Sequence, residues 1–151
     1  MKQYLGVKLV TAEPEVSMID GRNEQREGYK VVYEDGYVSW SPKVVFEKAY
    51  RIIDGLTFGL AIEAMRMGKK VCRAGWNGKG MFIYIQESSI VPVVCMNPNV
   101  TKHMFGESLL ECDASVKIQA HIDMKAADGT LTIGWNPSQI DMLSEDWMVV
   151  D

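Results

Sequence analysis

The sequence predicts a small α+β protein with antiparallel strand pairing, and three features lead to this prediction. Asp-Gly turns at 35–36 and 128–129 separate runs rich in β-branched and aromatic residues, which is typical of β-hairpins. A stretch that begins at Thr57 carries apolar residues at helical spacing. The length of 151 residues, with 47% apolar and 24% charged residues, is that of a soluble globular protein with its own core. We expect a small antiparallel sheet domain with two or three short helices.

The chain is expected to have two parts, an N-terminal hairpin–helix extension over residues 1–55 and a larger domain over residues 56–151. In the extension, a first strand is expected ahead of Lys8. The polar run over residues 20–28 is expected to be a loop.

A β-hairpin and a helix should complete the extension. The strands are expected over residues 29–33 and 37–40, because Gly36 between them supplies the positive φ of a tight turn. A helix should follow, with Ser41 as its N-cap and Pro42 at its first position. The expected inner face holds Phe46, Ala49 and Tyr50, and the solvated face holds Glu47 and Arg51.

The larger domain is expected to begin with a helix at Thr57. Its apolar stripe consists of Phe58, Ala61, Ile62 and Met65, at positions i, i+3, i+4 and i+7. Gly68 suits the left-handed position after the last turn of this helix. Short strands are expected over residues 70–73 and 81–85.

The rest of the domain divides into an irregular and a regular part. Prolines and glycines interrupt residues 86–117, which we expect to be a long loop with a helical turn at 107–111. Regular elements should follow it, with strands over 118–125, 130–133 and 147–150 and a short helix over 139–143.

The composition excludes several classes of function. Sixteen Lys and Arg against twenty Asp and Glu give a net charge of −4, which argues against unspecific DNA or RNA binding. The spacing of Cys72, Cys95 and Cys112 fits neither a disulfide framework nor a zinc site. The start lacks a signal peptide, and no stretch approaches the roughly 18 apolar residues of a membrane helix. We therefore expect a cytosolic protein that does not bind membranes.

Catalytic motifs are missing from the sequence as well. His103 and His121 are isolated, there is no HxH, HExxH or His–Asp pair for a metal, and no GxSxG elbow or Walker loop is present. The adjacent acids Glu145 and Asp146 are expected to be solvated. These absences favour binding over turnover, with no catalytic residue, cofactor or metal.

Two turns combine tryptophan with glycines and small polar residues, one over residues 73–80 and one over residues 134–141. The rings of Trp76 and Trp135 have two open interpretations, as caps of the hydrophobic core or as walls for a flat ligand. Trp147 lies outside both turns, in a closing strand, and is expected in the core.

Several ordered blocks of the sequence resemble the phage Thoeris anti-defence two family. The similar blocks are residues 57–65, 68–71, 73–82 and 138–147, within a match over about residues 57–151. The resemblance implies a non-enzymatic sponge that holds cyclic ADP-ribose signals intact in the cytoplasm of an infected bacterial host. It also implies a homotetramer with ligand sites between subunits and, as a second ligand class at a separate site, cyclic trinucleotides. The segments 1–55 and 87–117 exceed what compact members of the family need.

The two turns and the helix at Thr57 contain the side-chain types that such a ligand requires. Aromatic rings stack on the purine, hydroxyl and amide groups bind sugar hydroxyls, and cations with glycine N–H groups bind the pyrophosphate. The candidate residues are Phe58, Trp76 and Trp135 for the base, Asn77, Ser138, Gln139 and Asp141 for polar contacts, and Arg73 and Lys79 with the N–H groups of Gly78 and Gly80 for the phosphates.

Two alternatives from other classes stay open. A phosphodiesterase or lyase would degrade the same signal, although the isolated histidines count against it. A structural or interaction module of a phage particle would give the extra N-terminal residues a purpose.

Overall fold

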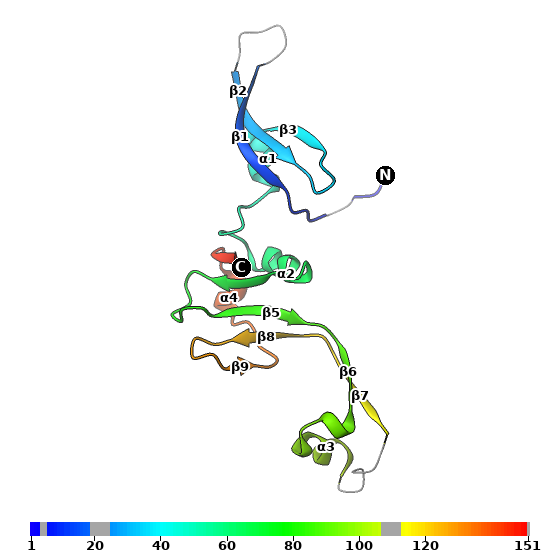
Figure 1. Cartoon of the computed structure of the whole chain (residues 1–151). Coiled ribbons are helices and arrows are strands. Elements are labelled where there is room, and N and C mark those ends of the chain that lie inside the picture. The colour runs from blue at the N-terminus through cyan, green and yellow to red at the C-terminus, as the bar shows by residue number, and fades with distance from the viewer. Residues whose placement is uncertain (4–5, 19–24, 107–112, 151) are drawn as a thin grey trace.

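The computed structural model describes residues 1–3, 6–18, 25–106 and 113–150. Its antiparallel sheets and short helices confirm the predicted α+β class. Figure 1 shows three parts in succession, with an N-terminal sheet at one end, a five-stranded sheet in the middle and a two-stranded arm at the other end.

The N-terminal sheet contains β1 (Thr11–Met18), β2 (Gln25–Val32) and β3 (Val38–Pro42) in the order β1-β2-β3. The predicted hairpin is confirmed as β2 and β3, and Gly36 in its turn has φ +82°. The first strand lies at β1, after Lys8 and not before it. Its sequence carries Pro14, which a sheet tolerates at an edge position such as that of β1, and this proline interrupts the alternation of Ala12, Val16 and Met18 that would otherwise indicate a strand.

Two further expectations for the extension are corrected. β2 begins at Gln25, inside the segment expected as a loop, while residues 19–24 of that segment lie outside the described residues. Helix α1 (Lys43–Ala49) follows Pro42 as its N-cap, not Ser41, because Ser41 and Pro42 still pair with β2.

Only part of the expected inner face of α1 is covered, and no residue of this helix is fully buried. Phe46 stacks on Tyr29 at a centroid distance of 4.3 Å and on Tyr50 at 4.8 Å, as an inward position requires. Ala49 is exposed, contrary to expectation. Glu47, on the outer side, accepts a hydrogen bond from the hydroxyl of Tyr29 at 3.0 Å.

The central sheet has the strand order β10-β4-β5-β8-β9. Its strands are β4 (Lys70–Arg73), β5 (Phe82–Gln86), β8 (His121–Lys125), β9 (Leu131–Thr132) and β10 (Trp147–Val150). The predicted strands over 70–73 and 147–150 are confirmed at both ends, and the strand expected over 81–85 is shifted by one residue.

Helix α2 (Phe58–Arg66) packs against this sheet. The hydroxyl of Thr57 caps it by accepting from the N–H of Leu60, and Gly68 ends it with φ +80°, as predicted. The core between helix and sheet consists of Leu56, Ala61, Met65, Val71, Ile83 and Trp147, each at most 6% exposed. The prediction that Trp147 is a core residue is confirmed.

The segment over residues 86–117 is not a loop. It forms the arm, with β6 (Ser89–Pro92), a 3-10 turn η1 (Val93–Cys95), helix α3 (Pro98–Phe105) and β7 (Ser115–Ile118). The prolines end or begin elements and do not interrupt them, since Pro98 follows the N-cap Asn97. The helical turn expected at 107–111 lies outside the described residues.

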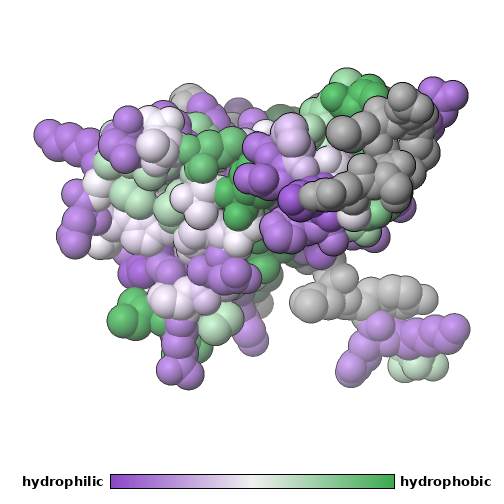
Figure 2. Space-filling model, turned by 90° about the horizontal axis from the view of Figure 1, so that it is seen from below, coloured by the Kyte–Doolittle hydropathy of each residue, from purple (hydrophilic) through white to green (hydrophobic). Residues whose placement is uncertain are grey.

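The strand expected over residues 118–125 is divided between two sheets. β7 ends at Ile118 and pairs with β6, whereas β8 starts at His121 and pairs with β5. Helix α4 (Gln139–Leu143) has the predicted bounds. Seen from the arm end, hydrophobic side chains lie interspersed with hydrophilic ones (Figure 2).

Candidate ligand-binding site at the tryptophan turns

The two tryptophan turns lie side by side because Trp147 stands between them in the fold. The ring of Trp147 lies 5.4 Å from that of Trp76 and 6.3 Å from that of Trp135, and these last two rings are 6.0 Å apart. All three pairs meet edge to face, the arrangement that the ring quadrupoles favour. Trp76 and Trp135 pack against the core and are half-buried as residues. Both rings therefore cap the core, while the two residues stay partly open to solvent, as a wall for a ligand would require.

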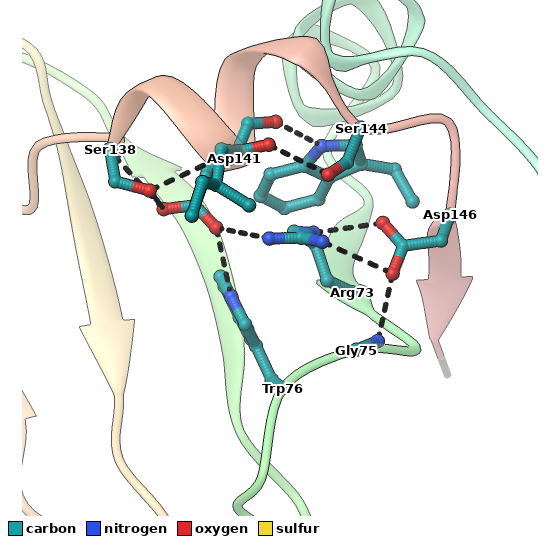
Figure 3. A network of polar contacts seen from close by, with 9 residues as sticks. Arg73, Gly75, Trp76, Ser138, Asp141, Ser144 and Asp146 are labelled. Carbon is teal, nitrogen blue, oxygen red and sulfur yellow. Dashed lines mark hydrogen bonds and ion pairs between the residues drawn. The ribbon is translucent and has the colours of Figure 1, made fainter.

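Arg73, at the end of β4, forms an ion-pair network with two acids from the C-terminal part of the chain (Figure 3). Its Nε and Nη2 atoms donate to the two carboxylate oxygens of Asp146 at 2.8 and 3.3 Å. Its Nη1 donates to Asp141 at 2.8 Å. The side chain is only 12% exposed. The guanidinium thus holds the start of the first turn against the segment that leads into β10.

Asp141 connects the second turn to the first. Its Oδ1 accepts from the guanidinium of Arg73 and from the indole N–H of Trp76 at 3.1 Å. Its Oδ2 accepts from the N–H and the hydroxyl of Ser138 at 2.9 and 2.6 Å, and the same hydroxyl accepts from the N–H of Asp141. This reciprocal pair is a capping box that starts α4.

These contacts keep both acids charged. Burial raises the pKa of Asp141, but hydrogen bonds from Ser138, Arg73 and Trp76 outweigh it and lower the pKa to about 2. The guanidinium of Arg73 lowers the pKa of Asp146, with help from the N–H of Gly75. The same acids raise the pKa of Arg73. One cation with two anions leaves this network with a net negative charge.

The remaining candidate residues lie around the network. Phe58 packs on Trp147 with a centroid distance of 5.3 Å, which places it in the core rather than beside the exposed edges. Asn77 and Lys79 are exposed in the first turn, and Gln139 is exposed at the start of α4. Two cavities, of about 390 and 410 Å³, lie elsewhere in the fold, and none of the candidate residues lines them.

The backbone of the first turn is fixed by close packing. A Cβ at Gly78 would collide with the side chains of Met81 and Ala127, so only glycine fits there. Gly80 has φ +70°, and its carbonyl accepts from Nζ of Lys125 at 3.1 Å. Asn77 and Lys79 therefore lie next to closely packed backbone.

Sequence reasoning missed Asp146, which was expected to be solvated together with Glu145. Glu145 is exposed, but Asp146 accepts from Arg73 and from the N–H of Gly75 at 2.8 Å. Trp147 pairs with Arg73 in the register of β4 and β10, which places the preceding residue beside the guanidinium. Only this strand register identifies the partner.

A His–Asp pair also escaped the sequence analysis. His121 and Asp123 lie two residues apart on β8 and thus on one face, with Nε2 of His121 3.4 Å from Oδ1 of Asp123. Asp123 is 3% exposed and accepts from the N–H of Gly134 at 3.2 Å. Asp123 thus holds the beginning of the second turn. Among the described residues no group of three or more His, Cys, Asp or Glu is placed to hold a metal ion.

Comparison with known proteins gives these turns a family context. The profile of the Thoeris anti-defense 2-like domain matches residues 56–150, a range that contains both turns and the whole ion-pair network. The chain belongs to this family. It is also 32% identical over 98 residues to Thoeris anti-defense 2 of Bacillus phage SP01, a match that covers 63% of this chain and 94% of that protein.

Membership in the Thoeris anti-defense 2-like family supports a phage role against Thoeris defence. The match begins at Leu56, directly before α2, and leaves the N-terminal sheet outside it. Within the described part of the chain, no helix has the length and apolar character needed to cross a membrane.

Proposed function

We propose that this protein binds a cyclic ADP-ribose-type immune signal at the two tryptophan turns and sequesters it without degrading it. In the cytoplasm of the infected host, the captured signal no longer reaches the Thoeris effector. The observation that carries this proposal is the family match, which spans the two turns that the fold brings together. No cofactor is required, because binding alone removes the signal.

The accessible sides of Trp76 and Trp135 are proposed to enclose the base, a contact worth about 1–3 kcal/mol per stacked base. Phe58 supports them from the core through Trp147. Because the Arg73 network already holds two carboxylates, we assign the pyrophosphate to Lys79 and to the N–H groups around Gly78 and Gly80. Arg73 then acts as a positioning residue for the turn.

Hydroxyl and amide contacts to the sugars are proposed for the exposed groups beside the rings. Asn77 and Gln139 each offer a donor and an acceptor, while Ser138 and Asp141 are already engaged with one another. Asp141 has one oxygen on the side of Trp76, where it can also accept from a ribose hydroxyl.

A site between subunits is proposed to complete this binding surface. Near the second turn, Ile133, Ile140 and Leu143 are 71%, 71% and 76% exposed, which suits contact with another copy of the chain. We propose a homotetramer, and cyclic trinucleotides as a second ligand class. Ile140→Lys is expected to shift the protein to smaller species in analytical ultracentrifugation, and an unchanged distribution would speak against this interface.

Capture and release of the signal tests the proposed function. The purified protein is incubated with cyclic ADP-ribose isomers or cyclic trinucleotides, freed of unbound ligand and heated, and the released material is analysed by mass spectrometry. Release of the intact molecule is expected. A cleaved product would indicate a phosphodiesterase or lyase, and no captured material from any candidate would leave a structural role.

Variants of the turn residues locate the site, and two of these residues, Asn77 and Lys79, are exposed, so that their substitution leaves the core intact. Lys79→Glu and Asn77→Ala should each lower capture at least tenfold, a change of about 1.4 kcal/mol in binding free energy. Trp76→Phe should lower capture as well, because the smaller phenyl ring has less contact area and cannot donate the indole hydrogen bond to Asp141. Tyr37→Ala, at an exposed aromatic in the N-terminal sheet, serves as the matched control. Full capture by the Lys79 and Trp76 variants would refute the assignment of the site.

A further inference from the structure

A cavity of about 390 Å³ lies where the N-terminal extension meets the central domain. Its floor is apolar and comes from the central domain, with Leu60 and Ala64 of α2 and Val149 of β10. Further lining comes from the extension, including Leu9 and Ile53, and from Met67 and Lys69 after α2. A volume of this size lies within the roughly 300–1,000 Å³ of small-molecule sites.

Large apolar side chains around this cavity remain open to solvent. Val7, Leu9, Met67 and Ile53 line it and are between 43% and 48% exposed. Each of them gains from a ligand that removes its apolar surface from water. The cavity therefore favours an occupant with an apolar body.

The charges around the cavity are all of one sign. Among the described residues that line it, Lys8, Arg51 and Lys69 are basic and none is acidic. Nζ of Lys8 lies over the ring of Tyr33 at 5.3 Å, and no carboxylate of the described residues lies within ion-pair distance of Arg51 or Lys69. A positive cluster in a protein of net charge −4 is a local feature that attracts an anionic group.

We propose that this cavity binds a small amphipathic anion, whose apolar body lies on Leu60 and Ala64 and whose carboxylate or phosphate group lies between Arg51 and Lys69. The site is separate from the tryptophan turns, since none of their candidate residues lines it. The lining residues of the extension, which are residues 6–9, 49–51 and 53, lie outside the family match. The ligand therefore belongs to the junction of the extension and the domain, and it fixes the two against each other.

Calorimetric titration of the full chain with single-chain amphiphiles below their micellar concentration tests this site. Decanoate and decyl phosphate carry the two candidate head groups, and decyltrimethylammonium has the same tail with a positive charge. We expect one anion per chain, bound at least tenfold more tightly than the cation. No binding of either anion at millimolar concentration, or equal binding of the cation, would overturn the proposal.

Charge-reversal variants at the cavity then test whether the anion binds there. Arg51→Glu and Lys69→Glu should each weaken binding of the anion at least fivefold, and both side chains are at the surface, so circular dichroism should confirm an intact fold. Lys117→Glu, on the exposed side of the arm, is the matched control and should bind like the original protein. Unchanged binding in both cavity variants would mean that the anion binds elsewhere.

A second copy of the chain is the competing occupant. In that case Arg51→Glu would shift the protein to smaller species in sedimentation, and decanoate would bind more weakly as the protein concentration rises. Either result would overturn the small-anion site. Capture of the immune signal at the tryptophan turns should stay intact in Arg51→Glu, so that failure here is distinguishable from failure of the proposed function.

Discussion

Asp141 joins the two tryptophan turns through a single carboxylate. One oxygen accepts from Arg73 and Trp76 of the first turn, and the other accepts from Ser138 of the second. Trp147 adds a hydrogen bond from its indole N–H to the carbonyl of Asp141 at 2.9 Å. Every one of these contacts places a ring or a turn of the candidate site. Asp141 is therefore the residue at which the stability of the fold and the geometry of the proposed site are most closely connected.

Acid is expected to weaken the fold through Asp141. Its pKa is about 2 in the folded protein against an ordinary value of 3.8, so its stabilising contribution is present above pH 3.8 and is lost as the pH falls through about 2. We expect the free energy of unfolding, measured with urea, to fall by about 2 kcal/mol between about pH 5 and about pH 2 from this residue. Asp146 adds in the same direction, because Arg73 lowers its pKa too.

The variant Asp141→Asn isolates this effect. It should be less stable than the original protein at neutral pH and should lose less stability on acidification. Glu145→Gln, at an exposed neighbouring acid, is the control and should follow the original protein. Equal acid sensitivity of Asp141→Asn and the original protein would assign the effect to other carboxylates.

At the scale of elements, α4 has only the five residues Gln139–Leu143 and cannot be stable without tertiary or capping contacts. Its capping box and the hydrogen bond from the Ser144 hydroxyl to the carbonyl of Ile140 at 2.7 Å supply local contacts at both ends. The helix carries the polar candidates Ser138 and Gln139 at its start. Loss of the cap is thus expected to affect the site as well as the helix.

Ser138→Ala should destabilise the protein by about 1 kcal/mol, the usual cost of losing an N-cap. Chemical denaturation at neutral pH measures this difference. Gln139→Ala, one residue further along and exposed, should change stability by less than about 0.5 kcal/mol. A loss as large in Gln139→Ala as in Ser138→Ala would mean that the capping hydroxyl is not the cause.

The arm shows where element prediction from sequence fails. Prolines and glycines in residues 86–117 suggest irregular chain, yet Pro92 ends β6 and Pro98 begins α3. Each proline lies at the end or start of an element, where its missing N–H is not needed for a hydrogen bond. Whether a proline interrupts an element therefore depends on where that element begins and ends, which composition does not reveal. By contrast, Thr57, Gly68 and Ser138 act through contacts within a few residues, and the helix limits that they predict are confirmed.

At the scale of the whole molecule, the junction between the extension and the domain is not a simple linker. Leu56 pairs with Trp147 through two backbone hydrogen bonds, and the N–H of Val149 donates to the carbonyl of Ile53 at 2.9 Å. Residues on both sides of the proposed boundary between residues 55 and 56 therefore form backbone hydrogen bonds with β10. Residues just before the family match contribute to the fold of the central domain.

Two truncated chains that begin on either side of Leu56 are expected to differ in stability for this reason. A fragment over residues 52–151 should be more stable than one over residues 57–151 by at least about 2 kcal/mol, since the shorter one loses the buried side chain of Leu56 and three hydrogen bonds. Thermal and urea unfolding of both fragments measure the difference. Equal stability would place the true boundary after Leu56.

The sequence by itself determined the α+β class, the hairpin at Gly36, the capped helix at Thr57 and the family, because these depend on contacts within a few residues or on ordered blocks of sequence. It also placed Trp147 in the core. Only the tertiary structure decided the partners of Arg73, because the register of β4 against β10 brings together residues 73 positions apart. It likewise decided that Trp76 and Trp135 meet around Trp147, since edge-to-face packing depends on distances in space that no local pattern records.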